Sequence, residues 1–169
     1  MINFFPSEHI TSSCKRKFGI CDYPGPSTTM AYIAEKQGED WIAAVDNYNR
    51  IRVYFVPIDH CIELWRADGI MDNRCDGCLF YDETIIFVEL KQRSPRGGNR
   101  QWIDMADKQL RSTIRHFEKE DVAANFSVKK AYIANSEKPK FISTRMERMD
   151  RFFTDTGYVL YIKNRIDIE

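Results

Sequence analysis

The fold is decided by residues 75–91, which read CDGCLFYDETIIFVELK. Two short apolar runs flank a polar turn at residues 81–84, and this pattern predicts a β-hairpin. If residue 81 pairs with residue 84, Asp76 lies directly opposite Glu89. Because side chains alternate between the two faces of a strand, Lys91 projects on the same side as Glu89.

The hairpin therefore brings two carboxylates together. Side chains at opposed positions have Cβ atoms roughly 5 Å apart, and like charges placed in this way destabilise a sheet. A chain tolerates such a pair when a cation lies between the two acids. The hairpin thus predicts a divalent metal ion bound by Asp76 and Glu89, with Lys91 beside it.

The cysteines form an odd set of five, so we do not expect a disulfide framework. Cys75 and Cys78 have the spacing of a zinc or redox pair. However, residues three apart on a strand point to opposite faces, and no second Cys or His pair at ligand spacing accompanies them. We expect both to be small buried residues, and we expect no zinc.

Length and composition favour one folded domain over residues 1–169, since 43% of the residues are apolar and 13% aromatic. We expect residues 1–40 to form an N-terminal extension with a short helix, and residues 41–164 to form the core. No apolar run approaches the length of a membrane span, and no signal peptide is visible. A cytoplasmic protein without a membrane partner is therefore expected.

Hydrophobic periodicity places further elements around the hairpin. The expected helices cover residues 29–36, 102–120 and 142–153, the last one stopped by Gly157. The expected strands cover residues 41–45 and 51–56, around a turn at 46–49, and residues 128–134 and 158–163. Residues 60–65 fit a helix or a strand. The order helix, strand, helix, strand after the hairpin favours an α/β fold with a mixed sheet.

A basic segment follows the hairpin, although the net charge of the chain is zero. Pro95, Gly97 and Gly98 predict a loop, and the helix after it carries further basic residues. The candidates for contacts with nucleic-acid phosphates are Arg93, Arg96, Arg100, Lys108, Arg111 and Arg115. A solvated loop and helix face is the alternative interpretation.

Together these motifs resemble the PD-(D/E)XK nuclease superfamily. The resemblance rests on Asp76, on the Glu89-Leu90-Lys91 tripeptide and on Gln109, and it covers roughly residues 70–135. The glutamine helix is similar to that of the recombination-exonuclease branch. The resemblance implies a restriction-endonuclease-like mixed sheet flanked by helices. It also implies Mg²⁺ or Mn²⁺ held by Asp76, Glu89 and the backbone carbonyl of Leu90, with Lys91 and Gln109 as further catalytic residues.

The chain departs from the superfamily pattern at three points. Cys75 stands where a proline usually precedes the aspartate. Many members carry a further acid upstream, for which Glu35 and Glu63 are the candidates. Some members of the same branch bind an iron–sulfur cluster through three later cysteines, but no cysteine follows Cys78, so we expect no cluster.

Two functions fit these observations. The first is a metal-dependent nuclease that hydrolyses phosphodiester bonds, with DNA as the expected substrate and RNA left open. The second is a catalytically inactive module that keeps the nuclease scaffold and binds protein or nucleic acid as an accessory or immunity subunit. A protein partner that supplies specificity fits either function. Strandedness, endo- or exonuclease action and oligomeric state stay open.

Overall fold

A computed structural model describes residues 1–23, 28–37, 40–92, 101–136 and 143–169. The prediction of an α/β fold is confirmed, and in these ranges the chain forms two sheets and two α-helices. The helices are α1 (Gln101–Phe117) and α2 (Ser143–Thr156), and two 3-10 turns cover Ser7–His9 and Asp121–Asn125. The strands are β1 (Thr11–Ser13), β2 (Lys17–Cys21), β3 (Tyr32–Ala34), β4 (Ala43–Asp46), β5 (Val53–Pro57), β6 (Gly77–Tyr81), β7 (Thr84–Lys91), β8 (Val128–Asn135), β9 (Val159–Ile162) and β10 (Arg165–Asp167).

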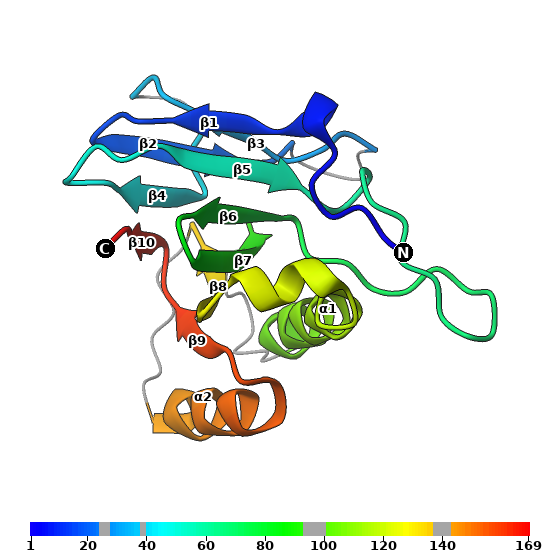
Figure 1. Cartoon of the computed structure of the whole chain (residues 1–169). Coiled ribbons are helices and arrows are strands. Elements are labelled where there is room, and N and C mark those ends of the chain that lie inside the picture. The colour runs from blue at the N-terminus through cyan, green and yellow to red at the C-terminus, as the bar shows by residue number, and fades with distance from the viewer. Residues whose placement is uncertain (24–27, 38–39, 93–100, 137–142) are drawn as a thin grey trace.

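The elements form three layers (Figure 1). The middle layer is a six-stranded sheet with the order β1-β5-β6-β7-β8-β9. A four-stranded sheet with the order β10-β4-β2-β3 covers one of its faces, and α1 and α2 cover the other. None of the helices in the described ranges is both long enough and apolar enough to cross a bilayer.

The predicted hairpin is confirmed as β6 and β7, in the predicted register. Tyr81 pairs with Thr84, and Gly77 pairs with Val88. At the turn, Asp82 has a φ of 46°, in the left-handed region that Asp tolerates better than most residues. Asp76 comes one residue before β6, so it lies across from Glu89.

The strand β7 is central to the fold. It pairs with β6 in the antiparallel sense and with β8 in the parallel sense. Every residue from Thr84 to Leu90 is buried, because both faces of the strand are covered. The predicted order after the hairpin is also confirmed, since α1 connects β7 to β8, and α2 connects β8 to the parallel strand β9.

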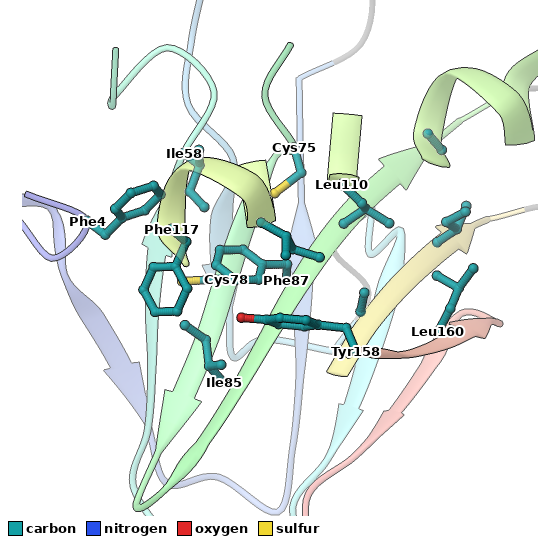
Figure 2. Packing of buried hydrophobic residues seen from close by; sticks show 14 of the residues in the cluster. Phe4, Ile58, Cys75, Cys78, Ile85, Phe87, Leu110, Phe117, Tyr158 and Leu160 are labelled. Carbon is teal, nitrogen blue, oxygen red and sulfur yellow. The ribbon is translucent and has the colours of Figure 1, made fainter. Parts of the chain in front are cut away.

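Each face of the large sheet has its own apolar core. On the helix side, Phe87 of β7 packs against Leu110, Phe117 and Tyr158 (Figure 2). The rings of Phe87 and Phe117 meet edge to face, with centroids 5.2 Å apart. The residues between the two sheets include Phe18, Val45, Phe55, Leu79, Ile86 and Tyr132. The two cores together fix β7, from which Glu89 and Lys91 project.

The first forty residues differ from the prediction. A helix over residues 29–36 is wrong, because residues 32–34 form β3 and pair with β2. Aromatic and β-branched residues such as Tyr32 and Ile33 favour a strand, whereas an isolated helix of two turns gains little stability. The first forty residues are also not separate from the core, as the prediction of an N-terminal extension had them. The strand β1 pairs with β5, and Phe4 is buried in the helix-side core.

The core also continues beyond residue 164. The strand β10 pairs in parallel with β4, and both Ile166 and Ile168 are buried. The predicted strand over residues 158–163 is confirmed as β9, although β10 follows it, and the predicted helix stop at Gly157 is also confirmed. Gly157 has a φ of 79°, a conformation that ends α2 at little steric cost.

The two strands expected around residues 46–49 exist as β4 and β5, but they do not form a hairpin. They belong to different sheets, and the turn between them carries the chain from one sheet to the other. Asn47 holds this turn, because its side chain donates to the carbonyl of Ile51 at 2.8 Å and accepts from the Ile51 N–H at 3.2 Å. Residues 60–65 form neither a helix nor a ladder strand; Trp65 makes an isolated bridge with Met71.

The two cysteines of the hairpin are buried and free, as predicted, but their predicted orientation is wrong. Cys75 and Cys78 both lie in the helix-side core (Figure 2). A bend at Asp76 precedes β6, so the alternation of faces does not extend to Cys75. The N–H of Cys75 instead donates to the hydroxyl of Thr113 on α1, at 2.8 Å.

Candidate metal and catalytic site

Asp76 is held rigidly at the start of the hairpin. Its backbone carbonyl accepts from the N–H of Ile58 at 2.9 Å, and its Oδ2 accepts from the N–H of Leu90 at 2.6 Å. The side chain is directed into the protein, since the residue is only 8% exposed. Burial raises the pKa of the carboxyl group to about 7, although the Leu90 hydrogen bond and the charge of Lys91 act in the opposite direction.

Glu89 is buried more deeply, with 1% of its surface exposed. Its Oε1 lies 2.9 Å from Nζ of Lys91. Its Oε2 finds no N–H or hydroxyl donor within the described part of the chain, and the hydrogen bond between the Glu89 and Asp76 side chains requires a proton on one of the two acids. Burial first, and the charge of Asp76 second, raise the pKa of Glu89 well above the ordinary value of a glutamate. The predicted pair of facing carboxylates is therefore present, and it is incompletely satisfied.

Lys91 connects the acids to α1. Its Nζ donates to Oε1 of Gln109 at 3.1 Å, and Nε2 of Gln109 donates to the carbonyl of Arg74 at 3.2 Å. Gln109 thus uses both ends of its amide, and it sets the direction from which the Lys91 ammonium approaches Glu89. The structure brings together the four side chains that the sequence singles out: Asp76, Glu89, Lys91 and Gln109.

The backbone carbonyl of Leu90 has the direction expected of a metal ligand. Successive residues of a central strand point their N–H and C=O groups alternately to the two neighbouring strands. The carbonyl of Lys91 accepts from Ser136, next to β8, whereas the N–H of Leu90 donates to Asp76. The carbonyl of Leu90 is therefore directed to the Asp76 side, beyond the end of β6.

Two further acids act on the site, and both were missed in the sequence. The charges of Asp22 and Asp59 raise the pKa of Asp76, after the effect of burial. Asp59 follows β5; its N–H donates to the carbonyl of Cys75 at 3.1 Å, and its carboxylate pairs with Arg74 at 3.1 Å. Asp22 follows β2, and burial raises its own pKa. A signal was present, because each acid comes within two residues of the end of a buried strand.

The two upstream acids suggested by the resemblance make contacts elsewhere. Oε1 of Glu35 accepts from the hydroxyl of Ser13 at 2.8 Å, which ties the segment after β3 to β1. Oε2 of Glu63 accepts from the indole N–H of Trp65 at 3.2 Å, within an exposed loop. Asp22 and Asp59 are therefore better placed than either residue to act as an additional acid.

The basic residues proposed to contact phosphates differ in whether their side chains are exposed or already paired with acids of the protein. Arg111 bonds to Asp107 on its own helix and to Asp155 of α2, so its guanidinium is engaged within the protein. Lys108 is exposed, and Arg115 is exposed with Asp72 at 3.8 Å. Arg93, Arg96 and Arg100 lie outside the described residues.

The oxygen donors fit a hard divalent cation. The carboxylates of Asp76 and Glu89 and the carbonyl of Leu90 are the ligand types that Mg²⁺ and Mn²⁺ prefer. Without an N–H or hydroxyl donor among the described residues, Oε2 of Glu89 is the atom that most needs such a cation. Among the described residues, no group of three or more His, Cys, Asp and Glu side chains is placed to enclose a metal ion. In proteins, Mg²⁺ is usually bound by one or two carboxylates and completed by water and substrate phosphate.

Comparisons of the chain with protein-family models, with curated proteins and with solved structures find no match.

Proposed function

We propose that the protein is a metal-dependent nuclease, and that Asp76, Glu89, Lys91 and Gln109 form its active site. The observation that carries the proposal is the buried pair of Asp76 and Glu89, in contact with the Lys91 ammonium at 2.9 Å from Glu89. Burying two neighbouring carboxylates with one lysine is costly, and a bound divalent cation removes that cost. The chain order hairpin, glutamine helix and parallel strand supports the resemblance to the PD-(D/E)XK superfamily.

In this proposal each residue of the site has a separate role. Asp76, Glu89 and the carbonyl of Leu90 would hold the cation, which, when bound, would make water more acidic and offset negative charge on the phosphate. Lys91 places a positive charge beside the reacting phosphate, where it stabilises charge that develops in the transition state. Gln109 orients Lys91 and is a positioning residue. The N–H of Leu90 keeps Asp76 turned toward Glu89.

One observation favours the alternative, a non-catalytic module on the same scaffold. Asp22 and Asp59 add negative charge near Asp76, and Arg111, one of the expected phosphate contacts, is engaged by Asp107 and Asp155. An acidic surrounding of this kind disfavours approach of a polyanion until cations are bound. A scaffold that retains metal binding without cleavage is therefore the second candidate.

A cleavage assay separates the two functions. The substrates are single-stranded DNA, double-stranded DNA and RNA, each with Mg²⁺ or Mn²⁺. We expect the wild type to cleave at least one of them, and Asp76→Asn to reduce the rate by at least about 100-fold, because it removes a metal ligand. Asp82→Asn is the matched control, since Asp82 lies exposed at the turn of the same hairpin and its left-handed backbone suits Asn equally well.

Calorimetry with Mn²⁺ completes the test. Saturable binding that Glu89→Gln abolishes, combined with no cleavage of any substrate, would establish the non-catalytic module. If the wild type neither binds Mn²⁺ nor cleaves, both candidate functions that use the metal site are wrong.

A further inference from the structure

An open cavity of about 490 Å³ lies where strands of the two sheets meet. Its walls come from β1, β3 and β5, through Thr11, Tyr32, Phe55 and Pro57. This volume falls in the range of small-molecule sites, about 300–1,000 Å³. The cavity thus has room for one nucleoside.

One wall of the cavity is aromatic and accessible. Tyr23 and Tyr32 line it together, with ring centroids 5.3 Å apart. The two residues are 50% and 37% exposed, so each ring keeps a surface on which a planar group can stack. Aromatic rings displayed in this way bind nucleobases without regard to sequence.

The charges in the lining favour a base over a phosphate. Among the described residues, the lining includes no Lys or Arg side chain, while Glu8 contributes a carboxylate and His9 and His60 contribute imidazoles. A phosphate needs cationic donors, whereas the amino group of a base can donate to the carboxylate of Glu8. The threonines of the lining, Thr11, Thr28 and Thr29, add hydroxyl groups that can pair with the edge of a base.

Backbone pairings link the segments that line the cavity to the segment that carries Asp76. Pro57, which lines the cavity, pairs with Gly77, the neighbour of Asp76. The segment that leads to His60 bonds to the same stretch, because the N–H of Ile58 donates to Asp76 and that of Asp59 donates to Cys75. Asp22, which acts on the pKa of Asp76, directly precedes Tyr23.

We propose that this cavity binds an unpaired nucleobase of the substrate strand, next to the phosphate that the Asp76–Glu89 site engages. The inference rests on the proposed function and adds a substrate class, namely single-stranded or locally unpaired nucleic acid. In a duplex, the faces of a base are covered by its stacked neighbours, so a base reaches Tyr23 and Tyr32 only when it leaves the stack.

Binding without cleavage tests the proposal. Fluorescence anisotropy in EDTA, and again with Ca²⁺ in place of Mg²⁺, compares a labelled single-stranded oligodeoxynucleotide with an abasic strand of equal length. We expect the wild type to bind the normal strand about tenfold more tightly than the abasic strand. We expect Tyr23→Ala and Tyr32→Ala to remove most of this preference, and Tyr23→Phe and Tyr32→Phe to retain it because the ring remains.

The control is Tyr48→Ala, which removes a tyrosine that is 58% exposed in the turn between β4 and β5. It should bind both strands as the wild type does. Equal affinity of the wild type for normal and abasic strands, or no binding of either strand, would overturn the proposal. The result is independent of catalysis. If the protein prefers the normal strand over the abasic strand but cleaves nothing, the base-binding role of the cavity is supported and the nuclease function is contradicted. If it cleaves but shows no such preference, the nuclease function is supported and the base-binding role is contradicted.

Discussion

Two glutamates of the protein each lie beside a lysine: Glu89 at the end of β7, and Glu118 just after α1. The two carboxylates differ in how fully their oxygens are hydrogen-bonded. Glu89 is buried with Lys91 on one oxygen, and the other oxygen has no N–H or hydroxyl donor in the described ranges. In contrast, Glu118 receives Nζ of Lys129 and the hydroxyl of Tyr158, each at 2.6 Å. The surroundings of Glu118 are arranged for stability, whereas those of Glu89 retain an electrostatic cost. Such a cost is typical of a site that serves a ligand.

The largest effect is expected from pH. The pKa of Asp76 is about 7 in the folded protein, against an ordinary value of 3.8. Above the unfolded value, the unfolded chain releases a proton that the folded chain retains, so stability falls as pH rises through this window. The loss reaches about 4 kcal/mol above pH 7, and Glu89 acts in the same direction.

Urea unfolding in EDTA between pH 4.5 and pH 8 measures this effect. Asp76→Asn should flatten the decline, because the amide does not titrate. A wild-type unfolding free energy that is constant, or that rises across this interval, contradicts the assignment of an unsatisfied acidic pair.

The second prediction compares the two glutamates directly. In EDTA at pH 8, Glu89→Gln should raise the unfolding free energy by about 2 kcal/mol, because the wild type must either bury a charge or keep a proton that the unfolded chain releases at this pH. Glu118→Gln should lower it by about 1 kcal/mol, because the bonds from Lys129 and Tyr158 lose their charge assistance. Thermal or urea denaturation measures both. If Glu89→Gln loses about as much stability as Glu118→Gln, Glu89 is satisfied as fully as Glu118 and the proposed difference between the two glutamates is wrong.

The third prediction concerns Gln109. Gln109→Ala should lower kcat about tenfold and leave KM nearly unchanged, because Lys91 loses the contact that orients it. Gln109→Glu keeps an oxygen for Lys91 and should recover part of the rate. Met105→Ala, on an exposed position one turn earlier on α1, is the control. Equal kcat values for Gln109→Ala and Met105→Ala would assign Gln109 a structural role only.

The hairpin and the site on it could be predicted from sequence because their geometry is local. A polar turn between two apolar runs fixes the register, which pairs Gly77 with Val88 and so brings the preceding Asp76 close to Glu89. The bend at Asp76 was not visible, so the alternation of faces gave the wrong orientation for Cys75.

The remaining parts of the site depend on pairings between distant segments. Asp22 comes from the four-stranded sheet, and Asp59 from the loop after β5; only the packing of the two sheets brings their charges to Asp76. For the same reason the sequence predicts β4, β5 and the turn between them, but not that the two strands join different sheets. Each strand has the pattern of a half-buried strand, and that pattern is the same whichever sheet it joins.

The rates of Lys91→Ala and Lys129→Ala in one cleavage assay test whether the Glu89 end of β7 is the active site. Both lysines pair with a glutamate, and their side chains are similarly exposed, at 18% and 22%. We predict that Lys91→Ala slows metal-dependent cleavage by about 1,000-fold, and that Lys129→Ala cleaves at the wild-type rate. Wild-type activity in Lys91→Ala, or equal losses in both variants, would contradict the assignment of the active site to the Glu89 end of β7.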